Sequence, residues 1–223
     1  MISLGGLVFL FGPEVVPENF QPQEILEISQ NADVIIIFNS GGWGDTPFEE
    51  AKDFAPIIEG IQETLEDLGY NSLVIPYKRT KNDFLGKIAG AKDFLSSFKS
   101  SSEVLAEKVE FLNKNLPDKK IIMAGLSAGG AFVNETMKKI SEETKGSVYG
   151  VSAGAPFWSE KVESENILYL DNNGRDILAA GDIKSLVFSL FSRKDQITAG
   201  HWYSWDAAEV GPQIVTFLKE KIH

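Results

Sequence analysis

Residues 119–139, with the sequence KKIIMAGLSAGGAFVNETMKK, decide the fold of this chain. The apolar run 121–124 is typical of a short buried strand, and the apolar residues after Gly130 recur at helical spacing. Between these two segments lies a turn with the sequence GLSAGG and with Ser127 at its apex. The stretch therefore predicts a strand, a sharp turn that carries a serine, and a helix.

The small residues around Ser127 suit such a turn. A serine at its apex adopts a strained backbone with positive φ, which lifts the side chain clear of the sheet. Gly125 and Gly129 remove bulk that would collide with the neighbouring strand or helix. The pattern resembles the nucleophile elbow, G-x-S-x-G, of the α/β-hydrolase superfamily. Over residues 33–221 the resemblance implies a hydrolase fold with Ser127 as its nucleophile.

The rest of the chain predicts an α/β fold of the same kind. Strands are expected at 34–38, 72–76, 147–151 and 166–170, and the five consecutive apolar residues of the first indicate burial on both faces. Helices are expected at 23–29, from Thr46 as N-cap to about 68 with a bend near Pro56 and a stop at Gly69, at 104–112, and at 207–221. This alternation predicts one mostly parallel, doubly wound sheet with helices on both faces.

We expect a single domain over residues 1–223. Residues from about 78 to 102 form either a small cap or lid over an active site, or a plain connecting helix with loops.

Composition excludes several functions. The chain of 223 residues has 32 acidic and 21 basic residues and a formal net charge of −11, so a nucleic acid partner is not expected. The absence of cysteine rules out disulfides, thiol catalysis and thiolate metal sites. The two histidines, His201 and His223, are too few for a histidine-rich metal centre, so neither a metal nor another cofactor is expected.

The apolar residues 1–11 lack the features of a signal peptide. They are also too few to span a bilayer, which takes roughly 20 apolar residues. We therefore expect no transmembrane segment and a cytoplasmic protein; a signal peptide preceding residue 1 would instead imply secretion.

A nucleophilic serine needs a general base and a third group that orients the base. His201 lies in a loop just before the last predicted helix, where the α/β-hydrolase order of nucleophile, acid and base places the histidine. The acid is expected in the loop after the strand at 166–170, with Asp176 preferred and Asp171 as the alternative. Asp195 is only six residues from His201, which leaves little room for the intervening elements.

An oxyanion hole needs two backbone N–H groups directed at the developing negative charge. The resemblance implies the amide of Ala128, directly after the nucleophile. The second donor is expected in the glycine-rich loop 39–45, at Gly42 or Trp43, with the choice left open. This loop does not match either of the common phosphate-binding glycine patterns.

Residues 150–154 contain a second G-x-S-x-G sequence, around Ser152. Pro156 follows too closely for a helix to start from that turn, so we interpret this copy as the end of a strand beside the site. Aromatic residues that flank the predicted loops could line an apolar acyl pocket: Trp43, Phe157, Trp158, Trp202 and Trp205.

Together these features predict a serine hydrolase of carboxylic esters, similar to an esterase or lipase, that acts on a small ester with an apolar acyl group. Leu126 replaces the histidine that many lipases carry before the nucleophile, which leaves the subfamily open. A thioesterase or serine peptidase would use the same groups, and a non-catalytic binding protein of hydrolase-like fold is the alternative outside enzymes. The oligomeric state is also left open.

Overall fold

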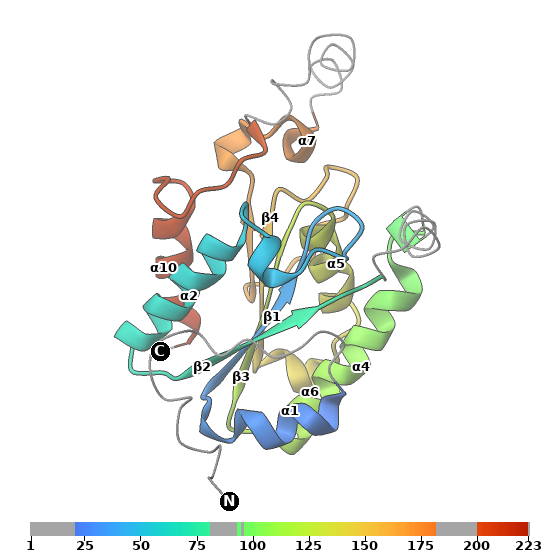
Figure 1. Ribbon diagram of the computed structural model, residues 1–223. Helices are drawn as coiled ribbons and strands as arrows, with labels where there is room; N and C mark the ends of the chain where they lie inside the picture. Colours follow the sequence, from blue (N-terminus) through green and yellow to red (C-terminus); the bar gives the residue numbers. More distant parts are fainter. Residues whose placement is uncertain (1–20, 81–92, 95, 182–199, 223) are drawn as a thin grey trace, which may run out of the picture.

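The computed structural model describes residues 21–80, 93–94, 96–181 and 200–222 (Figure 1). In these ranges five parallel strands form one sheet in the order β2-β1-β3-β4-β5. The strands are β1 (Val34–Asn39), β2 (Ser72–Tyr77), β3 (Lys120–Leu126), β4 (Val148–Ala153) and β5 (Ile167–Leu170). The strands expected from the sequence are all present, and the predicted parallel, doubly wound sheet is confirmed.

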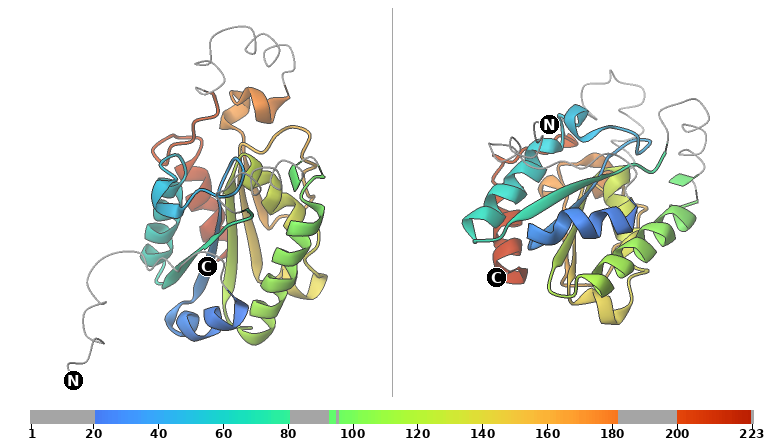
Figure 2. Two further views of the ribbon diagram at one scale, coloured as in Figure 1. Left: turned by 45° about the vertical axis from the view of Figure 1, so that its right-hand side comes forward. Right: turned by 60° about the horizontal axis from the view of Figure 1, so that its bottom comes forward.

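Helices pack on both faces of the sheet, which gives three layers (Figures 1 and 2). The helices are α1 (Pro22–Ile28), α2 (Ala55–Asp67), α4 (Lys99–Asn115), α5 (Ala128–Met137), α6 (Glu142–Lys145), α7 (Ile177–Ala180) and α10 (Gly211–Lys221). Single 3₁₀ turns occur at Ser29–Asn31, Phe48–Glu50 and Asn172–Gly174.

Strand β1 is buried on both faces, which explains why apolar and polar residues do not alternate in its sequence. Val34, Ile36 and Phe38 face the core formed with α2 and α10. Ile35 and Ile37 face the opposite core, which contains residues of α1, α4 and α5. Each apolar side chain buried in this way contributes about 1.5–3 kcal/mol, so both faces of the strand favour the folded state.

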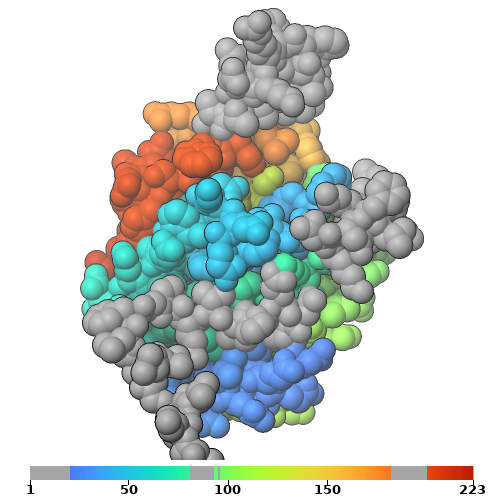
Figure 3. Space-filling view, viewed as in Figure 1, coloured from blue at the N-terminus to red at the C-terminus, as the bar shows by residue number. Residues whose placement is uncertain are grey.

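Helices α2 and α10 lie side by side on one face, although they are far apart in the chain. Figure 3 shows the cyan surface of α2 and its preceding segment beside the red surface of the C-terminal segment. Trp205 fits against Gly60 of α2, where an added Cβ would come within 2.3 Å of its ring. This contact anchors the segment that leads from His201 to the last helix.

The topology places a crevice between β1 and β3. The chain leaves β1 for β2 on one side, while β3, β4 and β5 extend the sheet on the other. In open α/β sheets ligands bind at the carboxyl ends of the strands where the order reverses in this way. Asn39 at the end of β1 pairs with Gly125 of β3, so the glycine-rich loop and the predicted elbow meet there.

Several predicted helix boundaries are wrong, and the helix expected at 104–112 is the longer α4, Lys99–Asn115. The helix expected from Thr46 begins only at Ala55, after the separate turn Phe48–Glu50. Six residues of continuous helix would rotate Phe54 about 120° away from Phe48, but both rings pack against Phe38, with centroids 5.3 and 6.3 Å away. The chain therefore breaks between the two rings.

The last helix begins at Gly211 rather than near residue 207. Pro212 lies in its first turn, where a proline is best tolerated because its missing N–H would be unpaired there. The predicted stop of α2 at Gly69 is confirmed, with a φ of +86° at that glycine.

The predicted cap or lid at about 78–102 lies partly outside the described residues, which omit 81–92 and 95. From Lys99 onward this range is the first turn of α4. The apolar N-terminal run and the segment 182–199 also lie outside the described residues. Among the helices that are described, none has the length and hydropathy needed to cross a membrane.

Candidate active site

Ser127 occupies a sharp turn between β3 and α5. Its backbone has φ 56° and ψ −118°, a combination that costs of the order of 1–3 kcal/mol and persists only where the surroundings enforce it. The Ser127 N–H donates to the carbonyl of Ala153 in β4 at 2.8 Å, and its own carbonyl accepts from Ala131 at 3.0 Å. The strained serine is therefore held by the adjacent strand and by its own helix.

The glycines of the turn are required by close backbone packing. A Cβ on Gly125 would lie 2.4 Å from the carbonyl carbon of Gly129, and one on Gly129 would lie 2.2 Å from the Asn39 carbonyl oxygen. No side chain fits in either place. The interpretation of these two glycines from the sequence is confirmed.

Ser127 and His201 line one cavity of about 470 Å³ at the carboxyl ends of β1 and β3. Its other lining residues are Phe38, Ser40, Gly41, Gly42, Thr46, Glu50, Ala51, Lys52, Asp53, Phe54, Leu126 and Trp202. The structure thus brings together the predicted nucleophile, the predicted base and the glycine-rich loop, although 74 positions separate Ser127 from His201 in the chain.

His201 Nδ1 lies 2.7 Å from Oδ2 of Asp176. The Asp176 side chain is almost fully buried, whereas that of His201 is 21% exposed. Asp176 Oδ1 also accepts hydrogen bonds from the backbone N–H groups of Leu178 and Ala179, at 3.0 and 3.2 Å, as the N-cap of α7. Both oxygens of this buried carboxylate are therefore paired.

The pKa of Asp176 reflects opposing effects. Burial raises it, but hydrogen bonds from His201, Tyr203 and Ala179 outweigh burial and hold the pKa below its ordinary value. The carboxylate therefore stays ionised at neutral pH and can orient the histidine ring.

Asp171, the alternative acid, has a local role. It is the N-cap of the 3₁₀ turn Asn172–Gly174, and its Oδ1 accepts from the Gly174 N–H at 3.3 Å. Asp195 lies outside the described residues.

Two positioning side chains were not predicted. Nδ2 of Asn172 donates hydrogen bonds to the carbonyls of Gly200 and Trp202, both at 3.0 Å, and so holds the backbone on either side of His201. The Tyr203 hydroxyl donates to Asp176 Oδ2 at 2.7 Å. In the sequence Asn172 looks like an ordinary turn residue, and its positive φ of 52° agrees with that pattern.

Of the three predicted oxyanion donors, Gly42 lines the cavity, whereas Ala128 and Trp43 are neighbours in the chain of its lining residues Ser127 and Gly42. Ala128 is buried and is the first residue of α5, where backbone N–H groups have no partner within the helix. Gly42 has a φ of +54°, in the region that favours glycine, and lies in a turn closed by the Gly44 N–H to the Gly41 carbonyl at 3.0 Å. Trp43 follows in the same turn, with its side chain 45% exposed.

Ser152 is the buried end of β4, as its sequence context predicted. Its hydroxyl donates to the carbonyl of Gly130 in α5 at 3.1 Å, and only 1% of the residue is exposed. The second G-x-S-x-G sequence therefore lies at the end of β4 and is hydrogen-bonded to α5, the helix that follows Ser127.

The five aromatic residues expected around an acyl pocket do not gather around one cavity. Trp202 lines the cavity beside Ser127, and Trp205 packs on Gly60. Trp43, Phe157 and Trp158 are among the most exposed large apolar side chains of the described residues. Of the five residues, Trp202 alone lines the cavity that contains Ser127, whereas Trp43, Phe157, Trp158 and Trp205 are not among its lining residues.

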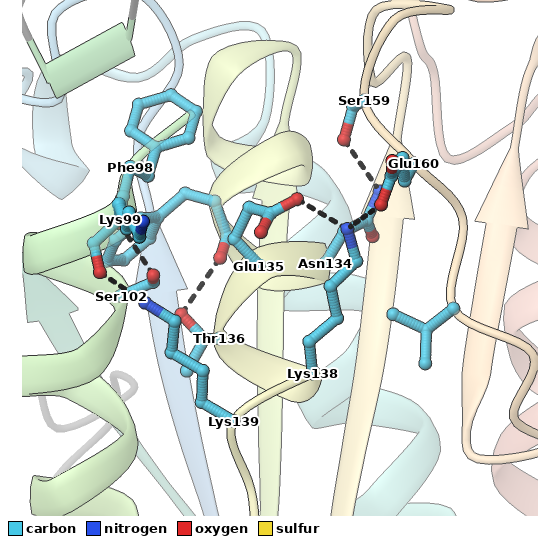
Figure 4. Close-up of polar contacts among 12 residues, drawn as sticks. Phe98, Lys99, Ser102, Asn134, Glu135, Thr136, Lys138, Lys139, Ser159 and Glu160 are labelled. Carbon is cyan, nitrogen blue, oxygen red and sulfur yellow. Dashed lines mark hydrogen bonds and ion pairs between the residues drawn. The ribbon is translucent and has the colours of Figure 1, made fainter. Parts of the chain in front are cut away.

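The helix after Ser127 is also tied to the segment beyond β4 (Figure 4). Lys138 Nζ contacts Glu135 at 2.7 Å and Glu160 at 3.0 Å, and Asn134 donates to Ser159 Oγ at 3.3 Å. Among the described residues, no group of three or more His, Asp or Glu side chains could hold a metal ion.

The class of fold is that of the α/β-hydrolases, which confirms the resemblance at the level of the fold. No protein-family model matches the sequence, and no curated protein matches it either. Two solved structures show the likeness. Trichoderma reesei cutinase in complex with a C11Y4 phosphonate inhibitor has a TM-score of 0.53 and 19% identity, with 86% of this chain and 83% of that chain covered. An acetylxylan esterase has a TM-score of 0.52 and 13% identity, with 86% of this chain and 100% of that chain covered.

Proposed function

We propose that this chain is a serine hydrolase that cleaves carboxylic esters, with Ser127 as nucleophile, His201 as general base and Asp176 as the acid that orients His201. One observation carries the proposal. Ser127 has the strained backbone of an elbow and shares a cavity with His201, whose Nδ1 lies 2.7 Å from the buried Asp176. The names of the two similar structures, a cutinase and an acetylxylan esterase, support an ester as substrate.

In the proposed reaction His201 donates its Nδ1–H to Asp176, so its Nε2 can accept the proton of the Ser127 hydroxyl. The Ser127 oxygen attacks the ester carbonyl carbon, and the resulting oxyanion accepts hydrogen bonds from the amide of Ala128 and from Gly42 or Trp43. His201 then protonates the alcohol as it leaves. Water, deprotonated by His201, attacks the acyl carbon, the bond to Ser127 Oγ breaks to release the acid, and His201 returns the proton to Ser127.

The cavity suits a small ester with an apolar acyl group. Phe38, Phe54 and Leu126 form apolar walls, while Glu50, Lys52 and Asp53 supply charge. Apolar walls beside a set of polar groups are typical of small-molecule sites. The proposed steps use side chains and backbone amides of this chain and require neither a metal nor an organic cofactor.

The test compares the two G-x-S-x-G serines. Wild type, Ser127→Ala, Ser152→Ala and His201→Ala are treated with a fluorophosphonate probe, and hydrolysis of p-nitrophenyl esters with short and long acyl chains is measured. We expect Ser127→Ala to abolish labelling and to lower kcat on the order of 10⁶-fold, while folded Ser152→Ala still reacts. Absence of labelling and turnover in folded wild type, or labelling that persists in Ser127→Ala, would overturn the proposal.

A further inference from the structure

Arg79 lies just beyond β2 and reaches across to the glycine-rich loop that follows β1. Strands β1 and β2 are paired neighbours, so the segments after their carboxyl ends lie next to each other. Nη2 of Arg79 donates hydrogen bonds to the carbonyls of Ser40 at 3.1 Å and Gly42 at 3.2 Å. One guanidinium nitrogen therefore holds two alternate peptide units of the loop.

The contacts extend over the whole turn. The Arg79 backbone N–H donates to the Gly44 carbonyl at 2.8 Å, and Thr80 Oγ1 donates to the Trp43 carbonyl at 2.8 Å. The remaining carbonyl, that of Gly41, accepts from the Gly44 N–H. Every carbonyl from residue 40 to residue 44 thus has a donor, and Arg79 provides three of these hydrogen bonds.

These hydrogen bonds also orient the amide N–H groups of the loop. The described peptide bonds are all trans, so each carbonyl points opposite to the N–H of the following residue. Because the Ser40 and Gly42 carbonyls point at Arg79, the N–H groups of Gly41 and Trp43 point away from it. Within the described residues, the amides of Gly41, Gly42 and Trp43 donate to no backbone carbonyl, and Gly41 and Gly42 line the cavity that contains Ser127.

Arg79 is itself firmly placed. Its guanidinium carbon lies 4.8 Å from the ring centroid of Phe98 and 5.2 Å from that of Phe132, which belongs to α5. Gly44 leaves the room that its side chain occupies, because a Cβ there would lie 2.5 Å from Nε. Burial lowers the pKa of Arg79 to about 10, against the effect of Asp93. The guanidinium therefore remains charged at neutral pH and links the loop to the helix that follows Ser127.

We propose that Arg79 is a positioning residue that holds residues 41–44 in the conformation in which the amide N–H groups of residues 41–43 stabilise the oxyanion formed at Ser127. The proposal rests on the proposed function, because it assigns the support of one half of the oxyanion hole in that reaction. Arg79 is not among the residues that line the cavity with Ser127, so it acts through the backbone of the loop.

The test uses two variants. Arg79→Met keeps the aliphatic part of the side chain but removes the guanidinium N–H donors, and Arg79→Lys keeps the positive charge. Lys138→Met is the matched control, since it removes a cation at the C-terminal cap of α5 that is bound to Glu135 and Glu160 (Figure 4). Each variant is titrated to completion with the fluorophosphonate, and kcat for p-nitrophenyl butyrate is expressed per titrated site.

Loss of one oxyanion donor typically lowers kcat about 100-fold to 1,000-fold. We expect Arg79→Met to lose at least about 10-fold in kcat per titrated site, with KM changed by less than about threefold, because the missing interaction belongs to the transition state. Binding of an alkyl boronic acid should weaken in parallel with kcat/KM. Arg79→Lys should recover only part of the loss, and Lys138→Met should match wild type.

A purely structural role for Arg79 predicts fewer titrated sites but an unchanged kcat per site. That result, or Arg79→Lys with wild-type kcat, would overturn the inference. A readout independent of activity is the ¹⁵N–¹H spectrum, in which Arg79→Met should shift the amide signals of Gly41, Gly42 and Gly44 while Lys138→Met leaves them in place. Unshifted signals would show that Arg79 does not hold the loop. Wild type without turnover or labelling would instead refute only the proposed function.

Discussion

The hydroxyl of Tyr203 donates a 2.7 Å hydrogen bond to Oδ2 of Asp176 in the interior of the protein. The same hydroxyl lies 3.2 Å from the Leu170 carbonyl, but it has one proton, and a charged acceptor forms the stronger bond. Tyr203 therefore stabilises the ionised form of Asp176, together with His201 and the backbone of α7.

This contact predicts a stability effect that depends on pH. Tyr203→Phe should lower the free energy of unfolding at pH 7 by about 1.5–3 kcal/mol, as for other hydrogen bonds to charged groups. The bond lowers the pKa of Asp176 in the folded state, below the value of about 3.9 for an unfolded aspartate. Its contribution is therefore fully present above about pH 3.9 and is lost as the pH falls through the folded-state pKa.

Urea unfolding of wild type and Tyr203→Phe at pH 7 and at pH values below 4 measures this difference. Tyr149→Phe is the control, since the Tyr149 hydroxyl donates to the neutral carbonyl of Gly146 at 3.1 Å. Its smaller penalty should not vary over the acid range. A Tyr203→Phe penalty that stays constant with pH would contradict the expected role of the Asp176 charge.

The choice between the two loop carboxylates can be tested directly. Asp176→Asn should lower kcat by about 10⁴-fold, because an amide no longer favours the histidine tautomer that leaves Nε2 free to accept a proton. Asp171→Asn changes a residue in the same loop whose carboxylate caps a turn, so its kcat should remain within a fewfold of wild type. Steady-state hydrolysis of p-nitrophenyl esters measures both, and equal losses would contradict the assignment.

Asn172 should act on the placement of His201. Asn172→Gly keeps a residue suited to the positive φ but removes the amide that holds the carbonyls of Gly200 and Trp202. We expect kcat to fall between about 10-fold and 100-fold, since small displacements of a reacting group have effects of this size. Asn173→Gly is the matched control, because Asn173 has a similar φ of 55° but is exposed. Similar kcat values for the two variants would argue against this role.

Gly154 packs closely against both the proposed acid and the proposed base. An added Cβ would lie 2.9 Å from both Asp176 Oδ2 and His201 Cε1, and the φ of +57° disfavours any other residue. Gly154→Ala should therefore cost about 1–3 kcal/mol of stability and lower kcat in the fraction that stays folded. Gly146→Ala, where nothing lies within 4 Å of the new Cβ, should preserve kcat. Thermal unfolding and ester hydrolysis compare them, and full activity of Gly154→Ala would refute the expected crowding.

Much of this arrangement could be predicted from the sequence because the signals are local. Unbroken apolar runs marked strands buried on both faces, and the glycines around Ser127 marked a turn too crowded for side chains. The same local signals misplaced the start of α2. Thr46 and Pro47 look like a helix start, but the packing of Phe48 and Phe54 on Phe38 determines where the helix begins.

The sequence by itself determined the succession of strands and helices along the chain, the sharp turn at Ser127 and the position of His201 before the last helix, since each depends on residues close together in the chain. The sequence favoured Asp176 but left Asp171 as an alternative in the same loop, and the tertiary structure shows that Asp176 is the one that reaches His201. Arg79 and Asn172 were beyond prediction. Their hydrogen bonds join residues 28 to 39 positions apart, and such pairs meet only because a parallel sheet gathers the ends of its strands along one edge.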